Sequence, residues 1–289
     1  MSQLWNTAHA QGTTQVVMPG ETMVEVFWNA VAQRGSRLMM REKKLGIWRG
    51  WTWNETGDAV RQLAMGLAAH GFQPGDCASI LSNTRLEWVL ADMAVLSAGG
   101  VSNGIYPTDS ASQVQYLCED SSTTVLFVED EEQLDKALVA REHLPKLRLI
   151  VVMDMEGLTR YNDPMVVSLD RLRVMGAAHD AEQPGVFEKR LTSRNPQDLA
   201  ILIYTSGTTG KPKGAMHSHA ALVYIVRGYN QVLRQDENDE RMLFLPLCHV
   251  AERLGGQYFS IYTGTVFNFV ENPDTCLLYT SDAADDTPC

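Results

Sequence analysis

The sequence has few cysteines, no excess of basic residues and no long apolar run, and each shortage excludes a class of protein. Its five cysteines are odd in number and never spaced Cys-x-x-Cys, which argues against a disulfide framework and a zinc site. Lys and Arg number 24 against 35 Asp and Glu, and the formal charge of -11 argues against nucleic acid as a partner. Neither a secretory signal nor an uninterrupted apolar run of about 18 residues occurs. We therefore expect a globular protein of the reducing cytoplasm, in which any anion is bound by a local site.

The apolar residues, 45% of the 289, are arranged in helical and strand patterns that alternate from residue 54 onward. One helical stripe begins near Asn54, a candidate N-cap, and ends near Gly71, and a second runs from Leu86 to Gly99. Between them and beyond lie short runs that are apolar on both faces, as buried parallel strands are, at residues 78–81, 125–128, 147–153 and 199–204. The pattern predicts an α/β fold with layered, largely parallel sheet.

Several conspicuous segments are assigned no function. Residues 175–197 mix charge, Pro and Gly without a clear period and are interpreted as a loop or subdomain junction. The acidic runs at 129–135 and 236–240 are interpreted as solvated helix ends, and 129–132 would also favour a helix N-terminus. His217 and His219, two apart at an expected helix start, would point to different sides and not chelate one metal. Packing is the preferred role for Cys248 and for four tryptophans, Trp48, Trp51, Trp53 and Trp88.

The informative segment is residues 204–214, Tyr-Thr-Ser-Gly-Thr-Thr-Gly-Lys-Pro-Lys-Gly, directly after the last expected strand. Its glycines let backbone N–H groups approach an anion closely, while the hydroxyls add donors and Lys211 and Lys213 add positive charge. The segment therefore predicts a polyphosphate-binding loop inside an acidic protein.

Two other interpretations of this loop fit less well. Aligned on the Walker A pattern, Thr205 stands where the first Gly belongs and Pro212 where the Ser/Thr belongs, and the proline disfavours a helix that starts right after Lys211. Ser206 is not a hydrolase nucleophile of the Gly-x-Ser-x-Gly type, because Tyr204 stands two residues before it. A Walker-type NTPase and a hydrolase are both disfavoured.

Residues 204–214 resemble the phosphate loop of the adenylate-forming superfamily, which comprises acyl-CoA synthetases, firefly-type luciferases and peptide-synthetase adenylation domains. Residues 245–253, Leu-Pro-Leu-Cys-His-Val-Ala-Glu-Arg, resemble that superfamily's second motif as long-chain fatty acid–CoA ligases carry it, and residues 82–108 resemble the same subfamily. The resemblance covers about residues 20–275 and implies the fold of an adenylate-forming N-terminal domain.

The resemblance also implies an activity: a carboxylate attacks the α-phosphate of ATP to give an acyl-adenylate, and coenzyme A then displaces AMP. The expected substrates are a fatty acid, ATP and coenzyme A, with Mg²⁺ beside the phosphates and contact with a membrane surface left open. His249 would lie beside the acyl group and the α-phosphate, and the hydroxyl of Thr205 would lie near Mg²⁺. The β- and γ-phosphates would be wrapped by Thr205, Ser206, Gly207, Thr208, Thr209, Gly210 and Lys211.

The resemblance divides the chain into an extension at residues 1–20, a partial AMP-binding domain at 21–275 with the junction near 175–197, and a tail at 276–289 that we expect to be foreign. The superfamily's later motifs and its C-terminal domain are not in the sequence, so we expect the fragment alone to lack the activity of its parent. An aryl or amino-acid adenylation enzyme and a non-catalytic nucleotide-binding protein remain alternatives. The acyl chain length and the oligomeric state cannot be deduced from the sequence.

Overall fold

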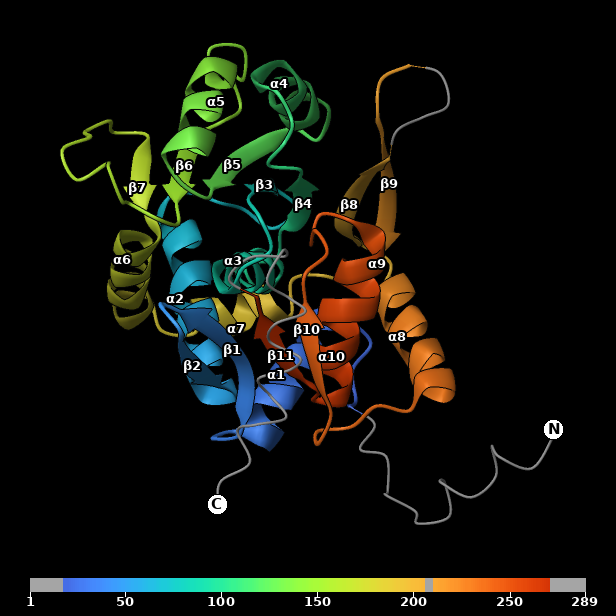
Figure 1. The fold of residues 1–289 in the computed structure, drawn as a ribbon. Helices are drawn as coiled ribbons and strands as arrows, with labels where there is room; N and C mark the ends of the chain where they lie inside the picture. Colours follow the sequence, from blue (N-terminus) through green and yellow to red (C-terminus); the bar gives the residue numbers. More distant parts are fainter. Residues whose placement is uncertain (1–17, 206–209, 271–289) are drawn as a thin grey trace, which may run out of the picture.

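The structure, a computed structural model, describes residues 18–205 and 210–270, whose strands form two sheets (Figure 1). The larger sheet contains, in spatial order, β7 (Val166–Ser168), β6 (Leu149–Val152), β5 (Thr123–Val128), β3 (Cys77–Leu81), β4 (Val101–Ile105), β8 (Leu199–Thr205) and β9 (Lys213–Ser218). The smaller contains β10 (Glu240–Leu243), β11 (Val266–Phe269), β1 (Leu38–Lys44) and β2 (Ile47–Thr52).

The larger sheet is parallel from β7 to β8, and only its last strand, β9, runs antiparallel to its neighbour. Strand β5 shows why its residues form a buried strand: Val125 and Phe127 belong to one core cluster, and Leu126 and Val128 to another. Alternate side chains point to opposite faces, so both faces of the sheet are buried. The predicted α/β fold with parallel sheet is confirmed.

Helices cover both faces of this sheet. The same two clusters place α2 and α3 on one face and α4 and α5 on the other. The helices of the described residues are α1 (Met23–Arg34), α2 (Trp53–Ala69), α3 (Leu86–Ser97), α4 (Ala111–Asp120), α5 (Glu131–Arg141), α6 (Leu169–Glu182), α7 (Val186–Leu191), α8 (His219–Leu233), α9 (Val250–Glu252), the π-helix η1 (Arg253–Tyr258) and α10 (Phe259–Thr263).

Both helices predicted from apolar stripes are present, but the cap of the first is two residues earlier than expected. Thr52 rather than Asn54 is the N-cap of α2, because Thr52 and Glu55 form a reciprocal capping box. Gly71 follows the end of α2 with φ of 78°, and Gly99 follows the end of α3 with φ of 84°. Such left-handed positions favour glycine, as the prediction assumed.

The loop interpretation of residues 175–197 is wrong, because α6 and α7 occupy most of that segment. A short apolar face hid α6 from sequence analysis, since its buried residues are only Leu169, Leu172 and Gly176. The helix packs so closely on α2 that a Cβ at Gly176 would lie 1.7 Å from the carbonyl oxygen of Gln62. The two helices link β7 to β8 of one sheet, and a domain junction there stays a prediction.

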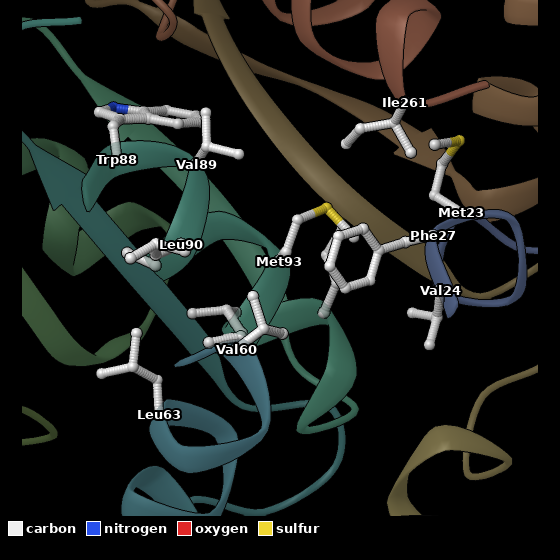
Figure 2. Close-up of a cluster of buried hydrophobic side chains, with 14 of the residues drawn as sticks. Met23, Val24, Phe27, Val60, Leu63, Trp88, Val89, Leu90, Met93 and Ile261 are labelled. Atoms are coloured by element: carbon white, nitrogen blue, oxygen red, sulfur yellow. The ribbon is translucent and has the colours of Figure 1, made fainter. Parts of the chain in front are cut away.

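The two sheets share one core. Figure 2 shows Met23 and Phe27 of α1 facing Met93 of α3 and Ile261 of α10, with Val60 of α2 beneath. The same cluster of buried side chains includes residues of β1 and β11 in the smaller sheet as well as residues of β3 and β5 in the larger. Within the described residues, no helix is long and apolar enough to span a lipid bilayer.

Candidate functional site

The predicted phosphate loop joins the antiparallel strands β8 and β9, which Figure 1 shows at the upper right beside α4. Tyr204 pairs with Gly214 and Thr205 with Lys213, so the loop begins and ends on adjacent strands. Thr205 is exposed at the carboxyl end of β8, the edge of a parallel α/β sheet at which ligands bind. Of the predicted loop residues, Ser206, Gly207, Thr208 and Thr209 lie outside the described residues, whereas Thr205, Gly210 and Lys211 lie within them.

The far end of the loop is held by an aromatic residue that sequence analysis did not single out. The Nζ atom of Lys211 lies 4.5 Å from the centre of the Tyr116 ring, and the Tyr116 hydroxyl donates a hydrogen bond of 2.9 Å to the carbonyl oxygen of Pro212. Tyr116 belongs to α4 and lines, with Lys211 and Pro212, a cavity of about 430 Å³. An ammonium over an aromatic face is a favourable contact, so α4 restrains the loop cation.

The near end of the loop is anchored on the same helix. The hydroxyl of Tyr204 donates a hydrogen bond of 2.7 Å to the carboxylate of Asp120 in α4. Burial and the neighbouring Asp120 raise the pKa of Tyr204, so this hydroxyl remains a donor at neutral pH. A Cβ at Gly214 would lie 3.1 Å from the Tyr204 ring, so glycine there makes room for the tyrosine.

The two other segments that carried the resemblance lie against each other. The Thr84 hydroxyl donates to the carbonyl oxygen of Leu245 at 2.6 Å and accepts from the backbone N–H of Leu247 at 3.1 Å. A Cβ at Gly104 would lie 2.7 Å from the Cα atom of Cys248, so glycine at this position lets the two backbones meet. Residues 245–248 therefore pack against residues 82–108.

His249 is exposed and acts as the N-cap of α9, with its Nδ1 atom accepting a hydrogen bond of 3.2 Å from the N–H of Ala251. An accepting Nδ1 carries no proton, and the exposed ring leaves Nε2 available to a ligand. Its neighbour Cys248 is 2% exposed, and burial raises the pKa of its thiol to about 12. This environment confirms Cys248 as a packed residue.

A cleft of about 570 Å³ opens beside this contact and is lined by residues 83–87, 106–108, 243–244 and 246, among others. Glu129 braces its wall: its carboxylate accepts hydrogen bonds from the backbone N–H of Asn83 at 2.7 Å and from the Asn83 side chain at 3.0 Å. The interpretation of residues 129–132 as a helix N-terminus holds for Asp130, the N-cap of α5, and for Glu131 and Glu132, which begin this helix. For Glu129 the solvated interpretation is wrong, because its carboxylate faces the loop at Asn83.

Beyond His249, the second motif enters the core. Arg253 is fully buried, and its guanidinium donates to the equally buried Asp92 of α3 and to the Ser102 hydroxyl of β4. Gln257 and Tyr258 donate to the same carboxylate at 2.6 and 2.8 Å. Burial alone would lower the pKa of Arg253, but the charges and hydrogen bonds of Asp92 and Tyr258 together outweigh it, and the pKa is raised. Sequence analysis missed this cluster because its members are up to 166 residues apart.

Of the histidines and tryptophans to which sequence analysis gave no function, His219, Trp53 and Trp88 are fully buried. His217 lies in β9, so its placement at a helix start is wrong, whereas His219 is the first residue of α8. His219 is fully buried, and burial lowers its pKa to about 4. Trp53 and Trp88 are fully buried, as a packing role requires. Among residues 18–205 and 210–270, no group of three or more His, Cys, Asp or Glu side chains is placed to hold a metal ion.

The parallel sheet, the loop at its carboxyl edge and the second motif packed on residues 82–108 are the features by which the chain can be compared with known enzyme families. The chain belongs to the AMP-binding enzyme family, whose pattern matches residues 26–282.

Among particular proteins, the chain is similar to the long-chain-fatty-acid–CoA ligase FadD15 of Mycobacterium tuberculosis, with 36% identity over 72% of this chain and 33% of that protein. It is 29% identical to the long-chain-fatty-acid–CoA ligase ACSBG2 of Rattus norvegicus over 96% of this chain and 43% of that protein. The chain thus spans less than half the length of these relatives.

Solved structures share the fold. The anthranilate CoA ligase AuaEII in complex with anthranoyl-AMP matches with a TM-score of 0.72 and 23% identity, over 86% of this chain and 44% of that one. The luciferase-like enzyme of the mealworm Zophobas morio matches with a TM-score of 0.73 and 17% identity, over 90% of this chain and 58% of that one. Both matches confirm the predicted fold of an adenylate-forming N-terminal domain.

Proposed function

We propose that the protein containing this chain activates a long-chain fatty acid with ATP and transfers the acyl group to coenzyme A. The acid's carboxylate attacks the α-phosphate of ATP, pyrophosphate leaves, and the thiol of coenzyme A then displaces AMP from the acyl-adenylate. The observation that carries the proposal is the loop of residues 206–212, which joins β8 to β9 at the carboxyl edge of the sheet. The relatives named as long-chain-fatty-acid–CoA ligases support the choice of acid.

The loop's part in this reaction is to position and neutralise the pyrophosphate leaving group. The residues proposed to wrap the β- and γ-phosphates are Thr205, Ser206, Gly207, Thr208, Thr209, Gly210 and Lys211. Lys211 brings positive charge, and Tyr116 keeps that charge at the rim of the 430 Å³ cavity. Because both ends of the loop are anchored, less conformational entropy is lost when the loop closes on a ligand.

A magnesium ion fits the donors at the loop. Mg²⁺ takes few ligands from the protein and several from phosphates and water, so a single exposed hydroxyl is an adequate protein contribution. Thr205, exposed at the end of β8, would supply it. When bound, the ion would neutralise the charge that develops on the leaving pyrophosphate.

The second motif would position the acyl group. We assign His249 to the side of the α-phosphate because its ring is exposed and its Nδ1 atom is already engaged at a helix cap, which orients Nε2. The buried Arg253 and Asp92 would position this segment from behind. We include a cytoplasmic location in the proposal because the cysteines of the sequence form no disulfide pattern. Contact with a lipid surface is included because the proposed acid substrate is a lipid.

The experiment measures acid-dependent exchange of labelled pyrophosphate into ATP, and thioester formation with coenzyme A, in the complete protein that contains this chain. Palmitate, benzoate and phenylalanine are compared as acids. We expect palmitate to be preferred. Preference for benzoate or phenylalanine would favour an aryl or amino-acid adenylation enzyme. ATP binding without any exchange would favour a non-catalytic nucleotide-binding protein.

Variants of the loop provide the matched test. Lys211→Ala should lower exchange by about 10² or more, the usual effect of removing a group that stabilises developing charge. Lys213→Ala, a change of the same kind two residues away in β9, should have a smaller effect. Unchanged exchange after Thr208, Thr209 and Lys211 are all replaced by Ala would refute the assignment of the loop.

A further inference from the structure

The loop between β3 and α3, residues 82–85, carries hydroxyl and amide side chains that do not cap the helix that follows. Serine, asparagine and threonine just before a helix commonly cap it. Here the N-cap of α3 is Arg85, whose side chain makes no capping hydrogen bond. The preceding residue, Thr84, directs its hydroxyl to residues 161 and 163 positions further along the chain. The hydroxyl therefore serves a tertiary contact and not the local helix.

Both hydrogen-bonding functions of this hydroxyl are used on the backbone of the second motif. Thr84 donates to the carbonyl oxygen of Leu245 at 2.6 Å and accepts from the N–H of Leu247 at 3.1 Å. The residue between them, Pro246, has no N–H, and its carbonyl oxygen accepts a hydrogen bond of 2.9 Å from the N–H of His249. A single side chain thus fixes the backbone on both sides of the proline at which the turn to His249 begins.

Apolar packing holds this stretch of the second motif unevenly. Leu247 is 1% exposed, whereas Phe244 and Leu245 are 45% and 42% exposed. Less apolar area is removed from water at the first half of the turn, so burial stabilises it less than it stabilises a core segment. The position of Leu245 therefore depends more strongly on the hydrogen bond from Thr84.

The loop that carries Thr84 is itself held in place. The carboxylate of Glu129, directly after β5, accepts hydrogen bonds from the backbone and the side chain of Asn83 and from the hydroxyl of Ser82. The backbone N–H of Glu129 donates to the carbonyl oxygen of Leu81, the last residue of β3. A side chain can hold another segment in place only when its own backbone is supported, and the ends of β3 and β5 provide that support here.

We infer that Thr84 is a positioning residue for the formation of the acyl-adenylate: it sets the place of His249 and, through His249, the alignment of the carboxylate with the α-phosphate. The inference rests on the proposed function and adds a residue to it. Thr84 acts through the backbone of residues 245–249 and not on a reacting atom. A displacement of about 1 Å at a reacting centre can lower the rate about 10²-fold, so two hydrogen bonds that fix this turn affect turnover.

The phosphate loop has separate supports, and this separation makes the role of Thr84 testable. Tyr116 and Asp120 of α4 hold the two ends of that loop. Loss of the Thr84 hydroxyl should therefore lower kcat and leave the KM for ATP unchanged, because the contacts proposed for the β- and γ-phosphates are not altered. A general structural defect would change both constants.

The test measures kcat and the KM for ATP in palmitate-dependent exchange of labelled pyrophosphate, in the complete protein that contains this chain. Thr84→Val keeps the shape of the side chain without its hydroxyl and should lower kcat about tenfold or more, with the KM for ATP changed less than about twofold. Thr84→Ser keeps the hydroxyl and should restore most of the parent's kcat. Thr159→Val, the same change at an exposed threonine between β6 and β7, should change neither constant.

Thr84→Ala separates the loss of the hydroxyl from any misfolding that valine causes. It removes the same hydroxyl without adding a methyl group, so it should reproduce the loss in kcat while circular dichroism and the KM for ATP stay those of the parent. A normal kcat in Thr84→Val and Thr84→Ala, or an equal loss in Thr84→Ser, would overturn the inference. A KM for ATP that rises as much as kcat falls would overturn it as well, because the role would then be merely structural.

A double-mutant cycle with His249→Ala shows whether Thr84 acts through His249. If it does, Thr84→Val should lower kcat in the parent and have no further effect in the His249→Ala background. Equal losses in the two backgrounds, or normal exchange in His249→Ala, would contradict the inference. Absence of palmitate-dependent exchange in the parent would refute the proposed function itself, and this result is distinct because it involves no variant.

Discussion

Asp92→Ala should be among the most damaging single substitutions in this chain. The carboxylate is completely buried and accepts hydrogen bonds from Arg253, Ser102, Gln257 and Tyr258. Removal of one partner of a buried ion pair costs about 3–5 kcal/mol, because the other charge stays buried without compensation. Since a domain is stable by about 5–15 kcal/mol, the variant should lose a large part of its free energy of unfolding.

Urea denaturation at pH 7, followed by circular dichroism, measures this loss. The double variant Asp92→Leu with Arg253→Met should be more stable than Asp92→Ala alone, because no buried charge remains. Glu132→Ala is the control: Glu132 is 73% exposed and lies 3.0 Å from Lys136, so its removal should cost less than about 1 kcal/mol. A loss below about 1 kcal/mol for Asp92→Ala, or a double variant less stable than the single one, would refute the reasoning.

Three further tests concern a close helix contact, a buried histidine and a helix cap, and each is measured by the free energy of unfolding. Gly176→Ala should cost several kcal/mol, since its Cβ would overlap the α2 backbone, whereas Gly228→Ala, with nothing within 4 Å, should stabilise α8 by up to about 1 kcal/mol. Equal effects would contradict the close helix contact. Because burial lowers the pKa of His219 to about 4, the unfolded chain binds the extra proton, and stability should fall as pH is lowered from about 6.5 to about 4. His219→Phe should flatten that slope, and an unchanged slope would exclude His219 as its source. Thr52→Ala should cost about 1 kcal/mol through loss of the α2 cap, and Asn54→Ala should cost less because Asn54 does not cap the helix. A larger cost for Asn54→Ala than for Thr52→Ala would contradict this cap.

Most of the larger sheet could be predicted from the sequence because its strands are apolar on both faces and its helices carry plain stripes and glycine ends. The stripe of α3 and its terminal Gly99 illustrate this. Helix α6 was not predicted, because a glycine at its contact with α2 stands where a pattern search expects a large apolar residue. The hairpin of β1 and β2 was equally hidden, since its residues are half exposed and rich in charge.

The candidate site, like the fold, could be predicted from the sequence only in part. Local chemistry marked the loop from Thr205 to Lys211, because glycine, hydroxyl and lysine act together there over a short stretch. The residues that hold the loop and the second motif, such as Tyr116 and Asp92, are distant in sequence and of ordinary type. Their importance depends on tertiary contacts, which no local pattern contains.

The contacts of α4 with the two ends of the phosphate loop have a mechanical consequence. Tyr116 reaches Pro212 from this helix, and Asp120, four residues later on the same helix face, receives Tyr204. The two ends of the loop are therefore each tied to α4, at residues one helical turn apart, in addition to the pairing of their strands with each other. A displacement of α4 away from the strands would break both ties at once, so the two ends of the loop would gain or lose this support together.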